Sequence, residues 1–462
     1  MIAALKTYMP FYRRNLSLAV PIMISQLGQT ITNIVDTIMI GHVGLREFAG
    51  ASFAIFVYLI PFFFLISFCS GITPFIGNSV GEGNPRKAAS FFAKGIAINS
   101  VLSIALVILC YAVIPFFPYM GQDPGILPFS RAYYWVIVLS IPPAALFFTF
   151  KSFSEALGNT RIPMFVTIGI NILNIFLNWC MIYGHCGFAA MGVAGAAWAT
   201  LISRIVGAAA LWVIFINRKE YSPVMVYLSR HVEKHFSTAM VKGKITAAEI
   251  ARGAKEVMAK SAGIGFQGLL EGVVFSVSAF ISGWFGRTAI AAYNIADQLS
   301  TATYMIAMGV GQASTIRVST WVGEGKFEHI RKAGFAALHL ALFFMVCCGI
   351  VFIIFRKAIP YIFVSEPHAA ALAADLIVLV SAYQVFDATQ LSGICALRGL
   401  KDVKIPLICS FISYYIIGMP CAYLLAVQAQ MGPRGVIIGL MAGLATAAVL
   451  FISRFLKLTR NY

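Results

Sequence analysis

The chain has 462 residues, of which 60% are hydrophobic and only 11% charged, and its mean hydropathy is +0.85. A soluble domain carries about 25% charged residues, so this composition excludes a soluble globular protein. The formal net charge is +17, but the basic residues are spread between apolar stretches, which argues against a nucleic-acid partner.

Apolar stretches of about 20 residues, the length that crosses a bilayer as a helix, repeat from Leu16 to the C-terminus. Six fall in each half, and the short alternating segments of a transmembrane β-barrel are not visible. Lys6, Arg13 and Arg14 lead into the first stretch with no small-residue cleavage site, so we expect no separate signal peptide. The expected spans are residues 16–40, 48–75, 91–117, 130–151, 163–184, 191–216, 257–284, 289–316, 333–358, 370–395, 405–427 and 433–456.

The second half of the chain repeats the first. Val80-Gly81-Glu82-Gly83 returns 242 residues later as Val322-Gly323-Glu324-Gly325. Gly158 to Pro163 pairs with Gly399 to Pro406, whose prolines lie 243 residues apart after an insertion. Met191-Gly192-Val193 pairs with Arg434-Gly435-Val436 at the same offset of 243. Three matches in the same order at nearly one offset indicate a duplication. In a membrane chain, duplicated halves are typical of transporters in which one half moves against the other.

The basic residues also indicate the orientation of the chain. With the N-terminus inside and the spans alternating, most Lys and Arg residues lie on the inner side, the pattern that marks the cytoplasmic face. We therefore expect both termini and residues 217–252 to be cytoplasmic. The outer side keeps six basic residues, namely Arg46, Arg131, Arg287, Arg356, Lys357 and Arg434.

A polar stretch from about Asn217 to Arg252 separates the halves. Within it, Thr246-Ala-Ala-Glu249 has the pattern of a capping box that starts a helix leading into the seventh span. The expected organisation is an N-lobe of six helices at 1–217, a cytoplasmic linker with an amphipathic helix at 218–254, and a C-lobe of six helices at 255–462.

Several kinds of chemistry have no support in the sequence. The nine cysteines contain no C-x-x-C, and the histidines show no paired ligand spacing, so neither a disulfide framework nor a structural metal site is indicated. No P-loop is present, so a pump built from this chain needs another energy source than its own ATPase site. No cofactor is expected.

Acidic residues inside the spans are the strongest functional signal. A carboxylate in the hydrocarbon region costs at least about 2.5 kcal/mol on insertion scales, so each needs a reason. Asp36, Glu271, Asp297 and Asp387 lie well within expected spans. The basic residues closest to them within spans are Arg204 and Arg317, both expected near inner ends, so ion pairing is not the simple explanation.

Polar neutral residues accompany these acids. Asn171, Asn174 and Asn178 lie in the fifth span, and Asn174 and Asn178, four residues apart, share a helix face. With Asp36 and Thr200 they can form a Na⁺ site or a proton-sharing network, although asparagine also joins membrane helices by ordinary hydrogen bonds. Tyr383 and Asp387 show the same spacing in the second half.

These segments resemble the multidrug and toxic compound extrusion (MATE) family. The resemblance rests on Asn33-Ile-Val-Asp36-Thr-Ile-Met-Ile-Gly41, on Ala156 to Pro163 and on Gly192 to Thr200. The NorM branch of this family is similar to the chain at Glu271 and at Tyr383-Gln-Val-Phe-Asp387, including the continuation of that segment to Asp402. One departure is Asp297, where this branch usually has an uncharged residue.

The resemblance implies an antiporter of the bacterial inner membrane that expels organic cations or other amphipathic drugs as Na⁺ or H⁺ enters, acting as a monomer and not as an enzyme. It assigns cation or proton coupling to Asp36, Asn174, Asn178 and Thr200 in the N-lobe and to Glu271, Tyr383 and Asp387 in the C-lobe, with Asp297 as a possible addition. Any Na⁺ would bind at the same carboxylates.

We expect an all-α membrane protein of about twelve transmembrane helices in two pseudo-symmetric six-helix lobes, with a central cavity that opens to alternate sides. Pro21, Pro61, Pro142 and Pro143 inside the spans are expected to bend their helices, either as hinges or as static kinks. The alternatives are a lipid-linked-oligosaccharide flippase of related architecture, a channel and a membrane-embedded enzyme. A flippase is expected to carry basic residues in its cavity, and no paired catalytic constellation is found.

Overall fold

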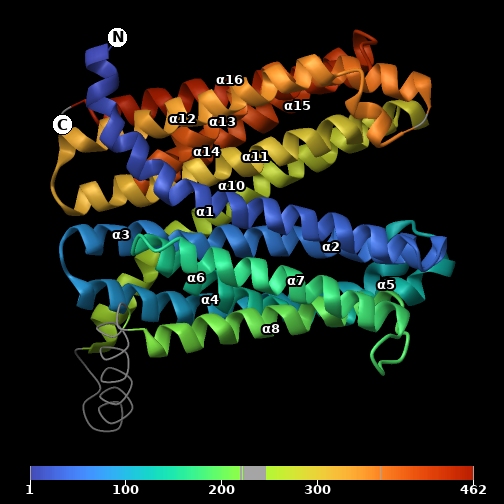
Figure 1. The fold of residues 1–462 in the computed structure, drawn as a ribbon, viewed down its shortest axis with the longest axis horizontal. Coiled ribbons are helices and arrows are strands. Elements are labelled where there is room, and N and C mark those ends of the chain that lie inside the picture. Colours follow the sequence, from blue (N-terminus) through green and yellow to red (C-terminus); the bar gives the residue numbers. More distant parts are fainter. Residues whose placement is uncertain (1, 219–220, 222–245, 365, 461–462) are drawn as a thin grey trace. The chain divides into compact units, whose positions relative to one another are not determined.

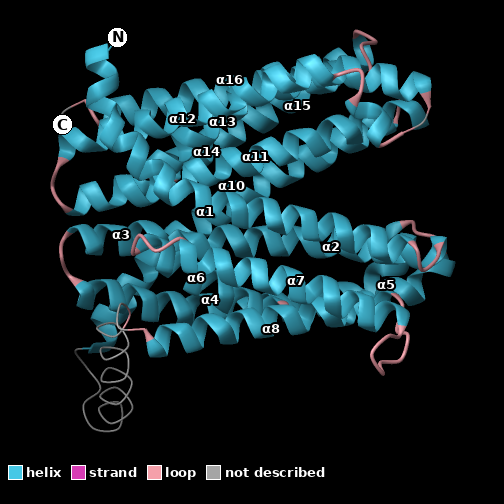
Figure 2. Ribbon diagram, in the orientation of Figure 1, coloured by secondary structure: helices cyan, strands magenta, loops and turns pink. Residues whose placement is uncertain are grey.

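The computed structural model describes residues 2–218, 221, 246–364 and 366–460, and within these ranges the chain is helical apart from short connections, with no strand (Figure 2). A membrane leaves few other choices, because backbone polar groups in lipid must be satisfied within the chain itself. A helix lies at each of the twelve expected positions. Residues 222–245 of the expected linker lie outside the described residues.

The described residues of the first half form eight α-helices (Figure 1). They are α1 (Ile2–Gly41), α2 (Leu45–Cys69), α3 (Thr73–Gly81), α4 (Pro85–Val113), α5 (Leu127–Leu139), α6 (Ile141–Ala156), α7 (Arg161–Tyr183) and α8 (Val193–Asn217). Short 3₁₀ segments at Ser70–Ile72, Ile114–Met120 and Pro124–Ile126 lie between them.

The second half contains α10 (Thr246–Gly283), α11 (Arg287–Gly323), α12 (Phe327–Phe355), α13 (Pro367–Gly399), α14 (Lys404–Phe411), α15 (Met419–Tyr423) and α16 (Pro433–Leu458). A 3₁₀ turn lies at Ile359–Ile362, and π-helical segments at Ile412–Gly418 and Leu424–Gln428 join α14, α15 and the approach to α16. From Thr246, the first described residue after Tyr221, α10 continues into the seventh expected span.

Eleven stretches among the described residues are long and apolar enough to cross a membrane. The helix outside this set is α11, which corresponds to the expected span at 289–316 and has 37 residues. Its composition explains the difference, because Ser, Thr, Gly and Ala take places that larger apolar residues hold in the other spans. The chain is thus an all-α, multi-pass membrane protein.

The duplication is visible in the helix boundaries. The ends of α1 and α10 at Gly41 and Gly283, and those of α3 and α11 at Gly81 and Gly323, lie 242 residues apart. The caps of α8 and α16, Gly192 (φ +55°) and Gly432 (φ +59°), lie 240 residues apart, so the predicted pairing of Gly192 with Gly435 was wrong. Between residue 124 and the start of α7 the offset is 243. At that offset Lys401 has the left-handed φ of +60°, at the position equivalent to Gly158, where φ is +87°. A lysine in this region is uncommon, so the shared helix ending, rather than the residue type, dictates the backbone there.

The packing divides the chain into two compact units that differ slightly from the sequence halves. Unit 1 contains Met1–Leu27 and Gln267–Tyr462, and unit 2 contains Gly28–Phe266. Two helices, α1 and α10, therefore contribute their first part to one unit and their second part to the other. The lobes expected at 1–217 and 255–462 stay a prediction.

Proline breaks one span and remains inside others. Pro142 and Pro143 occupy the first turn of α6, and Ser140 stands between α5 and α6, so this span is divided there instead of bent within one helix. Pro21 and Pro61 lie inside α1 and α2. The equivalent span of the second half, α13, has no such prolines and is continuous.

Glycines allow α16 to approach α15 and the π-helical segments. A Cβ added to Gly439 would lie 2.2 Å from Ala422 Cα, and one added to Gly435 would lie 2.5 Å from Ala426 N. Such small-residue contacts let membrane helices pack backbone to backbone.

Replacing Gly439 by Val is expected to destabilise unit 1 by more than the about 1–3 kcal/mol typical of overpacking, because the clash is with backbone atoms. The measurement is the thermal unfolding midpoint of the purified protein in detergent. Gly169→Val on α7 is the matched control, since its Cβ meets nothing within 4 Å. An unchanged midpoint for Gly439→Val would contradict the close packing.

Candidate functional site

In unit 2, Asp36 lies on α1 close to the end of the helix and is partly buried. Asn178 on α7 is fully buried, and its Nδ2 donates a hydrogen bond to Asp36 Oδ1 at 2.5 Å. Asn174 precedes Asn178 by one turn, as the sequence spacing predicted. The acid thus contacts a face of α7 made of neutral amides.

The Asn174 amide lies between Asp36 and Thr200. Its nitrogen faces Asp36, where Nδ2 donates to both carboxylate oxygens, at 3.0 and 3.2 Å. Thr200 Oγ1 on α8 lies 3.4 Å from the same amide. This arrangement suits an ionised Asp36, because a carboxylate is an acceptor only and its bonds are charge-assisted. The structure therefore brings together the four residues Asp36, Asn174, Asn178 and Thr200 from three helices.

The predicted position of one basic residue near this network was wrong. Arg204 was expected near the inner end of its span, but it lies midway along α8, one turn after Thr200. Its Nη1 donates to Tyr58 OH and, at 2.6 Å, to Ser140 Oγ at the break between α5 and α6. The guanidinium also lies over the Phe62 ring, 4.2 Å from its centroid. The i, i+4 spacing from Thr200 was the available signal.

In unit 1, Glu271 on α10 and Asp387 on α13 share one hydrogen-bond donor. Gln390 Nε2 donates to Glu271 Oε1 at 3.1 Å and to Asp387 Oδ1 at 3.2 Å. Tyr414 OH in turn donates to Gln390 Oε1 at 3.1 Å, which fixes the amide orientation. Asp387 is 3% exposed, so this pair of acids lies within the helical packing. Glu271 also lines a small cavity with Tyr414.

Tyr383 lies one turn before Asp387 on α13 and is buried. Its hydroxyl accepts a hydrogen bond from Ser300 Oγ on α11 at 3.0 Å. Asp297, one turn before Ser300 and also on α11, lies close enough to act electrostatically on Tyr383. The structure thus brings Asp297 to the edge of the group formed by Glu271, Tyr383 and Asp387.

Several residues in this group were not identified from the sequence. Gln390 was missed although it follows Asp387 by three residues on α13. Arg398 was counted as a cytoplasmic charge, but its Nη2 and Nε donate to Gln267 Oε1 at 2.8 and 3.1 Å. Gln267 Nε2 continues the chain of bonds to Ser410 Oγ at 3.3 Å.

Each unit contains a hydrogen-bonded pair of one tyrosine and one serine hydroxyl, and the tyrosine and the serine occupy exchanged positions in the two repeats. In unit 2, Tyr58 OH and Ser140 Oγ are 3.4 Å apart. At offsets of 242 and 243 the equivalent positions are Ser300 and Tyr383, which also bond to each other. The glycine caps of α8 and α16, Gly192 and Gly432, lie 240 residues apart, and at that offset the position equivalent to Arg204 is Leu444, which is buried. The duplicated framework therefore holds a fixed cation beside the pair in unit 2 and acids beside the pair in unit 1.

None of the four acids forms an ion pair among the described residues. Nor does the described part of the chain gather three His, Cys, Asp or Glu side chains at a distance suited to a metal ion. The arrangement is instead one of single or paired carboxyls surrounded by amides and hydroxyls. Such groups can take up and release protons, or contribute oxygen ligands to a monovalent cation.

Comparison with known proteins agrees with this architecture. The MatE family model matches residues 21–180 and 264–424. "Multidrug resistance protein NorM" of Aliivibrio fischeri is 28% identical over 453 residues, covering 97% of this chain and 95% of the relative. "Probable multidrug resistance protein NorM" of Rhizobium meliloti is 29% identical over 464 residues, covering 97% and 94%.

Solved structures show the same fold. A Vibrio cholerae MATE transporter, VcmN, matches with a TM-score of 0.86 at 17% identity and covers 99% of each chain. A eukaryotic MATE transporter, AtDTX14, matches with a TM-score of 0.85 at 18% identity and covers 98% of each chain. Since the family model matches more than half of the sequence, with one match in each repeat, the chain belongs to the MatE family, whose members are transporters rather than enzymes.

Proposed function

We propose that the chain is a secondary active antiporter that exports organic cations or other amphipathic drugs in exchange for Na⁺ or H⁺ by alternating access. It acts as a monomer in the bacterial inner membrane, with both termini in the cytoplasm. The observation that carries the proposal is the set of acids inside the helical bundles, none of them ion-paired in the described structure. Asp36, Glu271 and Asp387 each accept a hydrogen bond from a neutral amide. The relatives described as multidrug resistance proteins support the substrate class.

In unit 2, Asp36 provides a proton-linked or cation-linked switch. An ionised Asp36 accepts hydrogen bonds from both Asn178 and Asn174, and a bound cation stabilises that form. Protonation removes the negative charge to which Asn174 and Asn178 donate. Protonation and cation occupancy exclude each other, and this competition is the coupling free energy that the exchange requires.

In unit 1, the bridging amide of Gln390 links the two carboxylates of Glu271 and Asp387. Two ionised carboxylates this close repel each other, so a Na⁺ ion or a proton between them lowers the free energy of the pair. Tyr383, with Asp297 beside it, adds a phenol oxygen one turn away. Binding and release of the coupling ion at this pair is the step that we assign to unit 1.

The alternative of a lipid-linked-oligosaccharide flippase requires basic groups for its pyrophosphate cargo. Arg204 and Arg398 lie inside the helical packing, but both donate hydrogen bonds to neutral partners. The four acids inside the helical bundles outnumber these two bases. This balance favours a cationic cargo.

The experiment that tests the proposal measures efflux of a fluorescent organic cation such as ethidium from proteoliposomes containing the full chain. A Na⁺ gradient and a pH gradient are imposed separately, and at least one is expected to drive efflux against the dye gradient. Protein-free liposomes and liposomes with a Glu271→Gln, Asp387→Asn double variant are the controls. Failure of both gradients to drive efflux, or ion flux without dye exchange, would contradict antiport.

A further inference from the structure

Three buried hydrogen-bond donors at the end of α11 have no acceptor. They are Nε and Nη2 of Arg317 and the indole Nε1 of Trp321, and among the described residues none accepts a bond from them. Arg317 and Trp321 are four residues apart, so both side chains project from one face of the last turns of α11. Leaving a buried donor unpaired costs about 1–3 kcal/mol, and more for a charged group, so three together indicate an external partner.

The surrounding side chains hold these donors in place. The Arg317 guanidinium lies 4.9 Å from the centroid of the Trp321 ring, and Lys326 Nζ lies 5.4 Å from it. His329 on α12 stacks on the same indole at 4.7 Å, and Phe11 of α1 lies 6.5 Å away. Trp321 is only 7% exposed. The indole therefore has little rotational freedom, and its ring remains against the guanidinium.

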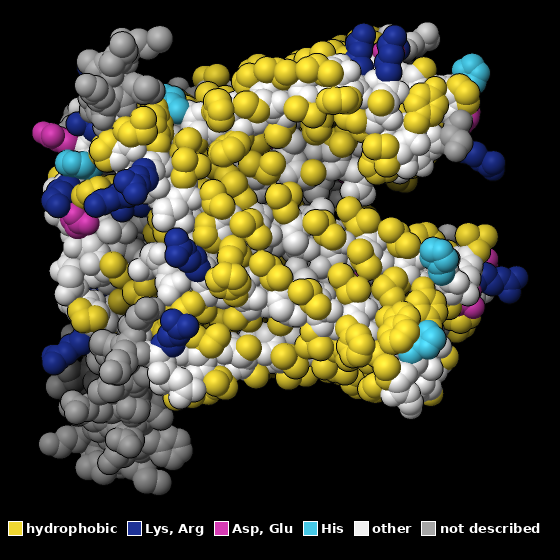
Figure 3. Space-filling view, in the orientation of Figure 1, with side chains coloured by type: hydrophobic (Ala, Val, Ile, Leu, Met, Phe, Trp, Pro, Cys, Tyr) yellow, Lys and Arg dark blue, Asp and Glu magenta, His cyan; other side chains and the backbone are white. Residues whose placement is uncertain are grey.

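The charge around the donors is positive. Arg14 of α1 and Lys326 add to the positive charge of Arg317. Glu324, the acid that acts on Arg317 among the described residues, is bonded to Lys326 at 2.8 Å instead. Basic side chains gather at this end of unit 1, where both termini lie (Figures 1 and 3). The missing acceptor is therefore expected to be an anion.

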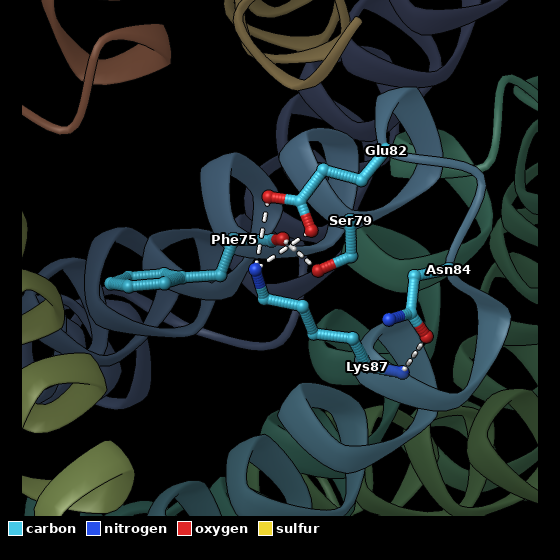
Figure 4. A network of polar contacts seen from close by, with 5 residues as sticks. All are labelled: Phe75, Ser79, Glu82, Asn84 and Lys87. Carbon is cyan, nitrogen blue, oxygen red and sulfur yellow. Dashed lines mark hydrogen bonds and ion pairs between the residues drawn. The ribbon is translucent and has the colours of Figure 1, made fainter.

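The first repeat shows that the fold itself does not need these donors. At an offset of 242, Arg317, Trp321, Glu324, Lys326 and His329 correspond to Phe75, Ser79, Glu82, Asn84 and Lys87, which Figure 4 shows together. There Ser79 Oγ donates to Phe75 O at 2.9 Å, and Lys87 Nζ pairs with Glu82 at 2.7 Å. Phe75 is 1% exposed. In the first repeat, the buried Phe75 ring thus takes the place of the guanidinium, and the Ser79 hydroxyl, in place of the indole, bonds to the backbone of its own helix.

We infer that Arg317 and Trp321 form a binding site for a phosphoryl anion, either the phosphate of an anionic lipid headgroup or soluble phosphate. The planar guanidinium presents Nε and Nη2 as a fork that matches two phosphate oxygens, and the indole N–H supplies a third bond. Lys326 and Arg14 add long-range attraction. The site is separate from the acids to which transport is assigned.

The test uses the full chain in nanodiscs of phosphatidylcholine, with and without added phosphatidylglycerol, at a salt concentration that screens surface charge. Phosphatidylglycerol is expected to raise the thermal unfolding midpoint of the wild type. Arg317→Gln and Trp321→Phe should each weaken this lipid affinity by roughly tenfold or more, the value of one charge-assisted hydrogen bond. A third arm adds millimolar inorganic phosphate to phosphatidylcholine discs. A rise there that depends on Arg317 identifies soluble phosphate as the ligand.

The matched control is Arg331→Gln, which removes an exposed positive charge from α12 at the same end of the unit and should leave the response intact. If Arg317→Gln fails to fold, Trp321→Phe still removes one donor while keeping the ring, and Arg317→Lys keeps the charge while losing the fork. A wild-type response in Trp321→Phe and Arg317→Lys, or no rise in the wild type with either anion, would overturn the site.

Discussion

Asp36→Asn is expected to abolish active efflux while the protein still inserts, folds and accumulates at a normal level. Asparagine has nearly the shape of aspartic acid, and Asn178 can still donate to its side-chain oxygen. The substitution removes the negative charge to which Asn174 and Asn178 donate. The variant is thus a permanent mimic of the protonated acid, and unit 2 is expected to remain in one arrangement.

The decisive measurement combines two quantities on the same purified variant: efflux per molecule in proteoliposomes and the thermal unfolding midpoint. A coupling role predicts that efflux falls by roughly 5- to 150-fold, the range that a coupling free energy of about 1–3 kcal/mol represents, with the midpoint preserved. A structural role predicts the reverse. Glu47→Gln, which neutralises an acid in the first turn of α2, is the control for charge loss in the same unit. Normal efflux per molecule would falsify the coupling role of Asp36.

Glu271→Gln and Asp387→Asn should each remove most ion-coupled efflux, again by roughly the 5- to 150-fold of a typical coupling free energy. In each variant the new side-chain amide oxygen can still accept from Gln390 Nε2, so the bond between α10 and α13 can be kept, but the repulsion that a cation relieves is lost. Because both acids act through one pair, the double variant is expected to be little worse than either single variant.

Initial rates of dye efflux at equal protein density test this expectation. Asp375→Asn is a matched control, since Asp375 lies on the same helix as Asp387 but is exposed and paired with Arg434. It should transport normally. Wild-type rates in Glu271→Gln and Asp387→Asn, or strictly additive losses in the double variant, would show that these acids do not form the coupling pair.

Much of the fold was predictable because it rests on local signals. Apolar length located the helices, and the repeated Val-Gly-Glu-Gly tetrapeptide predicted the matched helix ends at Gly81 and Gly323. The site was predictable where helical spacing alone sets the geometry. Asn174 and Asn178 share a face of α7, and burial cost marked the acids that the structure surrounds with amides.

The rest depends on contacts between residues far apart in sequence. Arg204 lies beside Tyr58 and Ser140 only because α8 packs near α2 and the break before α6, and no pattern within α8 encodes that. Gln390 becomes informative once Glu271, 119 residues earlier, is seen to share its amide. Arg398 lies near a helix end, where the sequence alone indicates a basic residue of the cytoplasmic face. Its bond to Gln267, which only the structure shows, gives it a place in the polar network of unit 1.

The passage of α1 and α10 from one packing unit into the other bears on how the duplication arose. Each repeat gives its opening segment to the unit that is otherwise built from the other repeat. A half-length ancestor with this path could complete a unit only with the opening segment of a second copy. We infer that it formed a homodimer in which the two copies exchanged their opening segments. Gene duplication and fusion would then link the two subunits of that dimer in one chain. By the same reasoning, residues 1–217 and 246–462 expressed as separate chains should each be incomplete and should complement each other.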